Sequence, residues 1–108
     1  MGNTNYISSI VKILEEPQKK ILYSKVEVRA QFCQARNNDL PVLVNLVFWG
    51  KLGDTILNYY KPTDYLIVEG YVSIKNKQKL TTKNQFLRYA EITVLKVCPF
   101  LLDLNLNP

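Results

Sequence analysis

The segment Val44–Leu52 constrains the fold of this chain more than any other part of its sequence. Val44–Trp49 is an apolar stretch of strand length that ends at the only tryptophan, and Gly50-Lys51 predicts a turn into a short helix. A second apolar strand, Tyr65–Gly70, follows the helix and ends at a glycine. A strand, a capping helix and another strand in this order are typical of a small barrel.

Five strands and one helix are expected along the chain. Lys25–Phe32 alternates cleanly, with apolar residues on one face and charged or polar residues on the other. The expected strands are residues 6–14, 25–32, 43–49, 65–74 and 89–97. The expected helix is residues 52–60, with Leu52, Ile56 and either Tyr59 or Tyr60 on one face. Residues 17–20, 34–41 and 75–88 are expected to be turns or loops. This order predicts an all-β fold, a five-stranded Greek-key barrel of the OB type with one short helix between the third and fourth strands.

A length of 108 residues predicts a single domain with one core. We expect residues 1–4 to be a flexible N-terminus, residues 5–98 to be the barrel domain, and residues 99–108 to be a short tail with leucines at 102, 104 and 106. No apolar run is long enough to span a bilayer and no signal or transit peptide is recognisable, so no membrane partner is expected.

The composition favours a polyanionic partner and disfavours catalysis. A net charge of +5 and a pI near 9.3 attract polyanions, although the lysine excess also fits AT-rich coding DNA. The chain has no histidine, the commonest general base and metal ligand, and the adjacent Glu15 and Glu16 point apart on a strand end. We therefore expect no enzymatic activity, no cofactor and no metal.

Cys33 and Cys98 lack CxxC spacing and are expected to be buried free thiols, with a disulfide as the alternative.

Trp49 is the leading candidate for a contact with nucleic acid. In the alternation it lies opposite Val44, Leu46 and Phe48, so it faces outward if those three residues form the core. An exposed aromatic side chain on a barrel strand can stack on a base, and such stacking contributes about 1–3 kcal/mol. The alternative is that the helix or a partner subunit buries Trp49.

Basic residues surround this position. The segment 71–90 contains no acidic residue and carries Lys75, Lys77, Lys79, Lys83 and Arg88. In OB-type barrels a loop between the last two strands can clamp a nucleic-acid strand, and phosphate contacts from these residues would make binding depend on salt. Lys25 and Arg29 could flank the same groove, and Tyr23 and Tyr71 are further stacking candidates; for all four, solvated or packing roles are the alternative.

Several stretches resemble the bacterial single-stranded-DNA-binding protein (SSB) family in order and spacing. They are Asn5-Tyr6-Ile7, Lys12-Ile13, Glu16-Pro17, Phe48-Trp49-Gly50-Lys51-Leu52, Tyr59-Tyr60-Lys61-Pro62-Thr63-Asp64 and Ile67-Val68-Glu69-Gly70-Tyr71-Val72. With Arg29–Cys33 added, the chain is most similar to the short SSB-like proteins of cyanobacteria and red-algal-type plastids. The resemblance covers residues 5–97 and implies an OB fold, sequence-tolerant binding of single-stranded DNA, and assembly as a homo-oligomer, either a dimer or a tetramer.

The resemblance also assigns roles to single residues. It places Trp49 at a base-stacking position and Lys51 in the matching turn. Leu43 and Lys77 stand where family members often have further tryptophans, which implies less stacking and more electrostatic binding. Asn45 replaces a common basic residue. The acidic, Phe-ended tip through which typical bacterial members recruit repair proteins has no counterpart at residues 107–108, so we expect no tail-dependent recruitment.

These observations predict a non-enzymatic module that binds single-stranded DNA between the Trp49 face and the loop 75–88. Its expected setting is DNA replication or repair, with replication proteins as further partners, in the plastid stroma or in the cytoplasm of a cyanobacterium. One alternative is a primosome-like accessory protein that acts mainly through protein contacts, for example at the leucines of the tail. The other is a barrel that binds RNA or only protein, because a fold does not determine a function.

Overall fold

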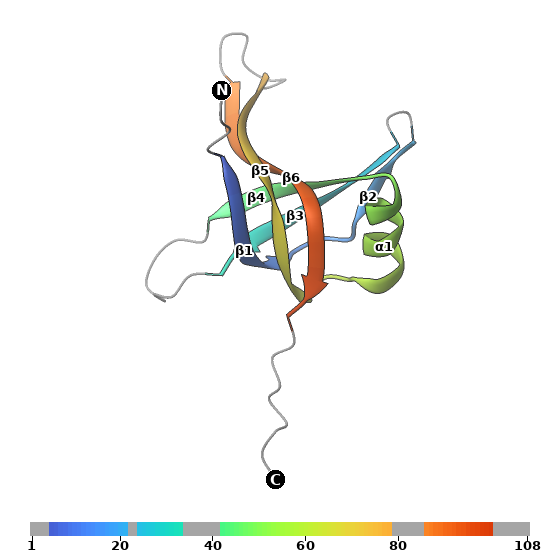
Figure 1. Cartoon of the computed structure of the whole chain (residues 1–108). Helices are drawn as coiled ribbons and strands as arrows, with labels where there is room; N and C mark the ends of the chain where they lie inside the picture. Colours follow the sequence, from blue (N-terminus) through green and yellow to red (C-terminus); the bar gives the residue numbers. More distant parts are fainter. Residues whose placement is uncertain (1–4, 22–23, 34–41, 79–85, 101–108) are drawn as a thin grey trace.

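The computed structural model describes residues 5–21, 24–33, 42–78 and 86–100. These residues form the strands and helix β1 (Tyr6–Ile13), β2 (Gln18–Lys20), β3 (Lys25–Phe32), β4 (Leu43–Trp49), α1 (Lys51–Tyr59), β5 (Tyr65–Gln78) and β6 (Phe86–Pro99). The strands make one sheet in the order β1-β5-β6-β4-β3-β2, and pairing between β1 and β3 closes it into a barrel (Figure 1). The predicted all-β barrel, with a helix between its third and fourth long strands, is confirmed.

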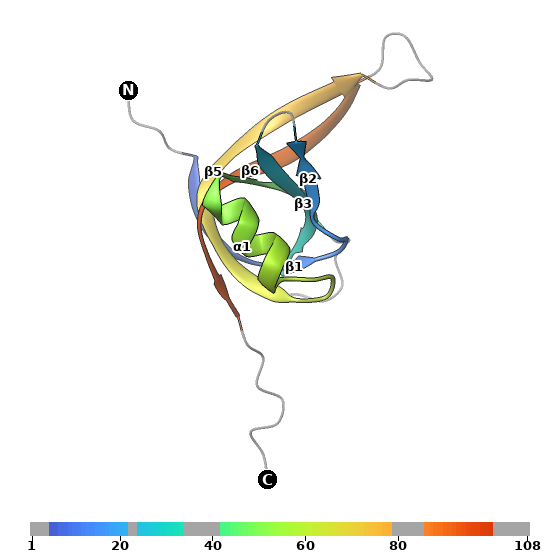
Figure 2. The same ribbon diagram turned by 90° about the vertical axis from the view of Figure 1, so that its right-hand side faces the viewer.

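The barrel core is built from alternate residues of the long strands. It contains Val11, Ile13, Val26, Val28, Ala30, Val44, Leu46, Phe48, Ile56, Leu66, Val68, Ile92 and Val94. Helix α1 lies across one opening of the barrel and contributes Ile56 to this core (Figure 2). Tyr60 packs against the core, whereas Tyr59 is 76% exposed, which decides between the two tyrosines considered from the sequence.

Two segments predicted to be turns or loops belong to strands. Gln18–Lys20 is the short strand β2, which pairs with the start of β3. β5 and β6 continue to Gln78 and back from Phe86, and they leave the barrel as a two-stranded ribbon (Figure 2). Because all three residues of β2 are exposed and the ribbon runs beyond the core, neither segment shows a marked apolar alternation.

Glycines are needed where the chain turns into α1 and where β5 and β6 approach closely. Gly50 joins β4 to α1 with φ of +61°, a conformation that residues with a Cβ rarely adopt. Gly70 lies at an irregularity in the β5–β6 register, and a Cβ there would collide with the backbone carbonyl of Thr93. The two positions fix where the barrel bends and where the helix begins.

Both cysteines are free, as predicted, but the prediction that they are buried is wrong because both are exposed. Cys98 lies in register with Ile67, on the row of β5 that alternates with the core residues Leu66 and Val68. Cys33 follows the last residue of β3, beyond the alternation of that strand. Their positions at strand ends therefore place both thiols outside the core.

Other predicted features lie outside the described residues. They are the N-terminal residues 1–4, Tyr23, the loop 34–41, the lysines at 79 and 83, and the tail leucines at 102, 104 and 106. In the part of the chain that the structure describes, no helix is sufficiently long and apolar to cross a membrane.

Candidate functional site

β3 and β4 carry a row of outward-facing side chains. Their pairing sets Lys25 opposite Trp49, Glu27 opposite Val47, and Arg29 opposite Asn45. The residues between these pairs point into the core, so Trp49 faces outward as the alternation predicts, and 47% of it is exposed. We refer to this surface as the β3–β4 outer face.

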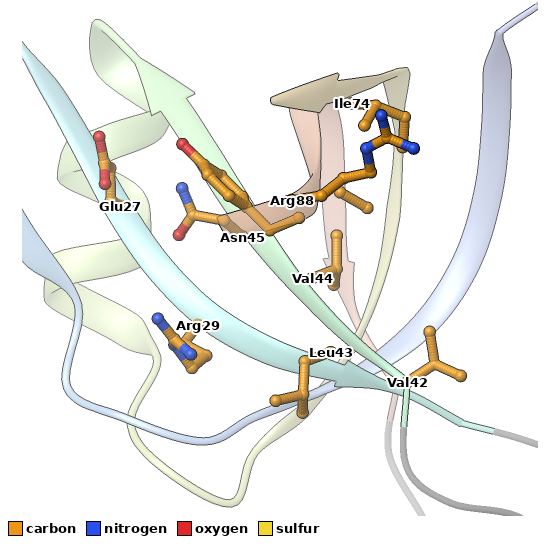
Figure 3. A pocket seen from close by; sticks show the side chains of 10 residues that line it. Glu27, Arg29, Val42, Leu43, Val44, Asn45, Ile74 and Arg88 are labelled. Atoms are coloured by element: carbon orange, nitrogen blue, oxygen red, sulfur yellow. The ribbon is translucent and has the colours of Figure 1, made fainter. Parts of the chain in front are cut away.

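A groove of about 560 Å³ adjoins the β3–β4 outer face (Figure 3). β4 and β6 pair in parallel over three residues each, Asn45–Val47 and Glu91–Thr93. The groove opens because the residues of β6 that precede Glu91 pair only with β5 in the ribbon and not with β4. One side is formed by Glu27, Arg29, Val42, Leu43, Val44 and Asn45, and the other by Ile74, Arg88, Tyr89 and Ala90. Its size is in the range of small-ligand clefts.

The groove combines apolar walls with charged side chains at its margins. Leu43 and Ile74 are both exposed. Arg29 and Arg88 lie on opposite sides of the groove (Figure 3), and a guanidinium is well suited to binding phosphate. Such an arrangement can neutralise a sugar–phosphate backbone while the bases contact apolar and aromatic side chains.

Two basic side chains of β3 are paired with carboxylates. The Nζ atom of Lys25 lies 3.1 Å from Oε2 of Glu27, and the Nε atom of Arg29 lies 3.7 Å from Oε2 of Glu15. Lys25 also places its ammonium 5.4 Å from the centroid of the Trp49 ring, which is a cation–π contact. The outer face is thus less positive than a count of its basic residues suggests.

The structure brings together four of the predicted site residues. Arg29 and Arg88 line the groove, and Lys25 and Trp49 lie on the adjoining outer face, one residue pair beyond Glu27 and Val47. Lys51 is exposed at the first position of α1, two residues after Trp49.

The expected lysine-rich loop 75–88 is in part a strand pair. Lys75 is exposed on β5 opposite Tyr89, and Lys77 belongs to the same strand opposite Leu87. Lys79 and Lys83 lie outside the described residues. The positive charge of this segment is therefore carried at least in part by a ribbon that projects beside the groove.

Tyr71 does not line the groove. It packs against Tyr6 of β1 with ring centroids 5.3 Å apart in an edge-to-face arrangement. The hydroxyl of Tyr6 donates a 2.8 Å hydrogen bond to Oε1 of Glu69, and this bond to the neutral phenol raises the pKa of Tyr6. The predicted stacking residue Tyr71 thus belongs to a separate aromatic cluster on β1 and β5.

Some groove residues were not predicted as contacts. Tyr89, Ile74 and Asn45 line the groove, and of these only Asn45 shares the outward alternation of Trp49 on the same strand. Tyr89 was expected to begin a strand and Ile74 to end one. Their role depends on the divergence of β6 from β4, which the sequence pattern does not encode.

No family model matches the chain. A curated protein of Trieres chinensis, named "Putative single-stranded DNA-binding protein ycf41", is 34% identical over 103 residues, which cover 92% of this chain and 91% of that protein. Two crystal structures share the fold. A small single-stranded DNA-binding protein from Streptomyces coelicolor has a TM-score of 0.76 and 12% identity, and the match covers 94% of this chain and 97% of that one. The SSB domain of a Synechococcus sp. protein has a TM-score of 0.64 and 20% identity, and the match covers 90% of this chain and 97% of that one.

Proposed function

Since this chain belongs to the family of the Trieres chinensis ycf41 protein, a family of SSB-like proteins, we propose that it binds single-stranded DNA without sequence preference. The observation that carries the proposal is an exposed Trp49 beside a groove with an arginine on each side. The DNA strand lies along the groove between β4 and the β5–β6 ribbon and continues over the β3–β4 outer face.

Phosphate neutralisation and base stacking both contribute to the binding free energy. Arg29 and Arg88 contact phosphates within the groove. Lys75 follows the groove residue Ile74 on β5, and Lys51 comes two residues after Trp49 at the start of α1. Leu43 and Ile74 exclude water from the bases, and Trp49 stacks on one of them. No step of this process requires a catalytic group, a cofactor or a metal, so the protein acts by binding alone.

The proposed setting is DNA replication or repair in a plastid stroma or in the cytoplasm of a cyanobacterium. This is supported by a relative that belongs to a red-algal-type plastid lineage. In that setting the protein covers single strands and works beside replication proteins. We further propose that it acts as a homo-oligomer, because covering a long strand favours several linked grooves.

A titration of Trp49 fluorescence with oligo-dT tests the proposal, because the chain has only one tryptophan. We expect quenching on binding that weakens when salt is raised from about 50 to about 200 mM, since phosphate contacts release counterions. Oligo-U of equal length and a duplex of equal length serve as comparisons, and both are expected to bind less tightly. If oligo-dT neither quenches Trp49 nor forms a retained complex, single-stranded DNA is not the ligand; if oligo-U binds more tightly, the ligand is RNA.

A further inference from the structure

Lys25, Glu27 and Trp49 form a contact chain at the edge of the groove. Lys25 is directly opposite Trp49 across β3 and β4, and Glu27 is the next outward residue along β3. The ammonium of Lys25 lies over the indole, 5.4 Å from its centroid, and 3.1 Å from the Glu27 carboxylate. One side chain thus contacts both the acidic residue and the aromatic ring.

We propose that this contact is a self-inhibiting gate on the base-stacking site. Glu27 holds Lys25 over Trp49 in the free protein, and a DNA phosphate opens the site by replacing Glu27 as the partner of Lys25. The released indole face then stacks on the base next to that phosphate. This inference rests on the proposed function, because it describes how the same site is regulated.

A base and an ammonium cannot occupy the same face of one indole. Stacking of a base on an exposed aromatic ring is stronger than a cation–π contact at an exposed site, so a base can displace Lys25. If a phosphate stands nearby, Lys25 exchanges one anionic partner for another, because its ammonium is a compact point charge that pairs with either anion. A ligand that brings a phosphate and a base together therefore opens the gate, whereas a free anion gains no stacking.

The Lys25–Glu27 pair is better protected from solvent than the pair that Arg29 forms with Glu15. The Lys25 and Glu27 side chains are 22% and 27% exposed, against 54% and 56% for Arg29 and Glu15. Screening by water and salt is therefore weaker at Lys25, and its carboxylate partner is held more firmly. Glu27 also lines the groove, so its charge meets an incoming phosphate unless Lys25 balances it.

The test compares Glu27→Gln with Glu16→Gln, which removes one negative charge from an exposed position between β1 and β2. Affinity for a labelled oligo-dT is measured by fluorescence anisotropy at one salt concentration. We expect Glu27→Gln to bind about two- to fivefold more tightly than Glu16→Gln, the range that a partly exposed ion pair supports. In the free protein, Glu27→Gln should also shift the emission of Trp49, and Glu16→Gln should not.

The same pair of substitutions is repeated in a Lys25→Met background, which keeps the aliphatic stem and removes the ammonium. If Glu27 acts by holding Lys25, the gain from Glu27→Gln disappears in this background, because a double-mutant cycle isolates the coupling. An equal gain in both backgrounds would mean that Glu27 only repels phosphates, and no gain over Glu16→Gln would remove any role of Glu27; either result overturns the gate. If the wild-type protein does not bind oligo-dT at all, the proposed function fails and the gate fails with it.

Discussion

At the scale of single residues, Phe48 contributes to the stability of the fold, and its neighbour Trp49 is available for binding. These neighbours on β4 point to opposite faces, so that Phe48 is 0% exposed and Trp49 is 47% exposed. Burial of the Phe48 side chain therefore stabilises the fold, whereas the ring of Trp49 remains half accessible to a ligand. Substitutions at the two positions should have separable effects.

Trp49→Ala is expected to weaken binding to oligo-dT by about 5- to 150-fold, which corresponds to the loss of about 1–3 kcal/mol of base stacking. Stability to urea should change by less than about 1 kcal/mol, because Trp49 is half exposed and lies outside the core, so that mainly its cation–π contact with Lys25 is lost. Affinity is measured by anisotropy of a labelled oligonucleotide, since the variant has no tryptophan. Phe48→Ala is the contrasting variant and should cost about 3–5 kcal/mol of folding free energy. Unchanged affinity in Trp49→Ala would rule out the stacking role.

Gly70→Ala tests the close approach of β5 to β6. The added Cβ would collide with the backbone of Thr93 and lie 3.0 Å from Cα of Val94, so β6 must shift. We expect a loss of about 1–3 kcal/mol in unfolding free energy, measured by urea denaturation. Ser8→Ala on the exposed face of β1 is the control and should stay within about 0.5 kcal/mol of wild type. Wild-type stability in Gly70→Ala would show that the two strands are less closely packed than described.

At the scale of elements, the sequence predicted those strands that have one buried face. Val26, Val28 and Ala30 alternate with charged residues, and β3 was assigned with its observed bounds. The ribbon residues Lys75 and Asn76 and the strand β2 lie outside this pattern, because they are exposed and are held in place by backbone pairing. The exposed tryptophan was therefore predictable, whereas the groove that forms where β6 diverges from β4 was not.

Ion pairs between elements were also beyond prediction from the sequence. Arg29 lies on β3 and Glu15 in the connection that follows β1, and their contact depends on the way the chain passes between these strands. Val47 is two residues before Trp49 and so shares its outward alternation, yet it is 1% exposed between Glu27 and Thr93 in the register. Alternation identifies the face of a residue but not how far neighbouring side chains cover it.

The ribbon should contribute to binding through Arg88. Arg88→Gln is expected to weaken oligo-dT binding and to reduce the slope of log affinity against log salt by about 0.7, the value for one phosphate contact on a single strand. Lys96→Gln removes an equal charge from β6 outside the groove lining, opposite Glu69, and serves as the matched control. Titrations at four salt concentrations give both slopes. Equal slopes for the two variants would place the DNA away from the ribbon.

At the scale of the whole molecule, the barrel presents two different exposed surfaces. The groove and the β3–β4 outer face carry basic residues, whereas the outer face of β1 and β5 carries the pairs Tyr6–Tyr71 and Ile10–Ile67. Tyr6 and Tyr71 are 44% and 39% exposed, and neither isoleucine belongs to the core. An aromatic and aliphatic surface of this kind suits a protein partner better than a phosphate backbone.

Tyr71→Ser distinguishes the two roles considered for this tyrosine. If the β1–β5 surface joins copies of the chain, wild-type protein should sediment above the monomer mass of 12.5 kDa, and Tyr71→Ser should shift it towards the monomer. Tyr59→Ser, on the exposed side of α1, is the matched control and should leave the mass unchanged. Lower affinity for a short oligonucleotide without a change in mass would instead make Tyr71 a stacking residue, and the bound strand would then have to extend beyond the groove around the barrel.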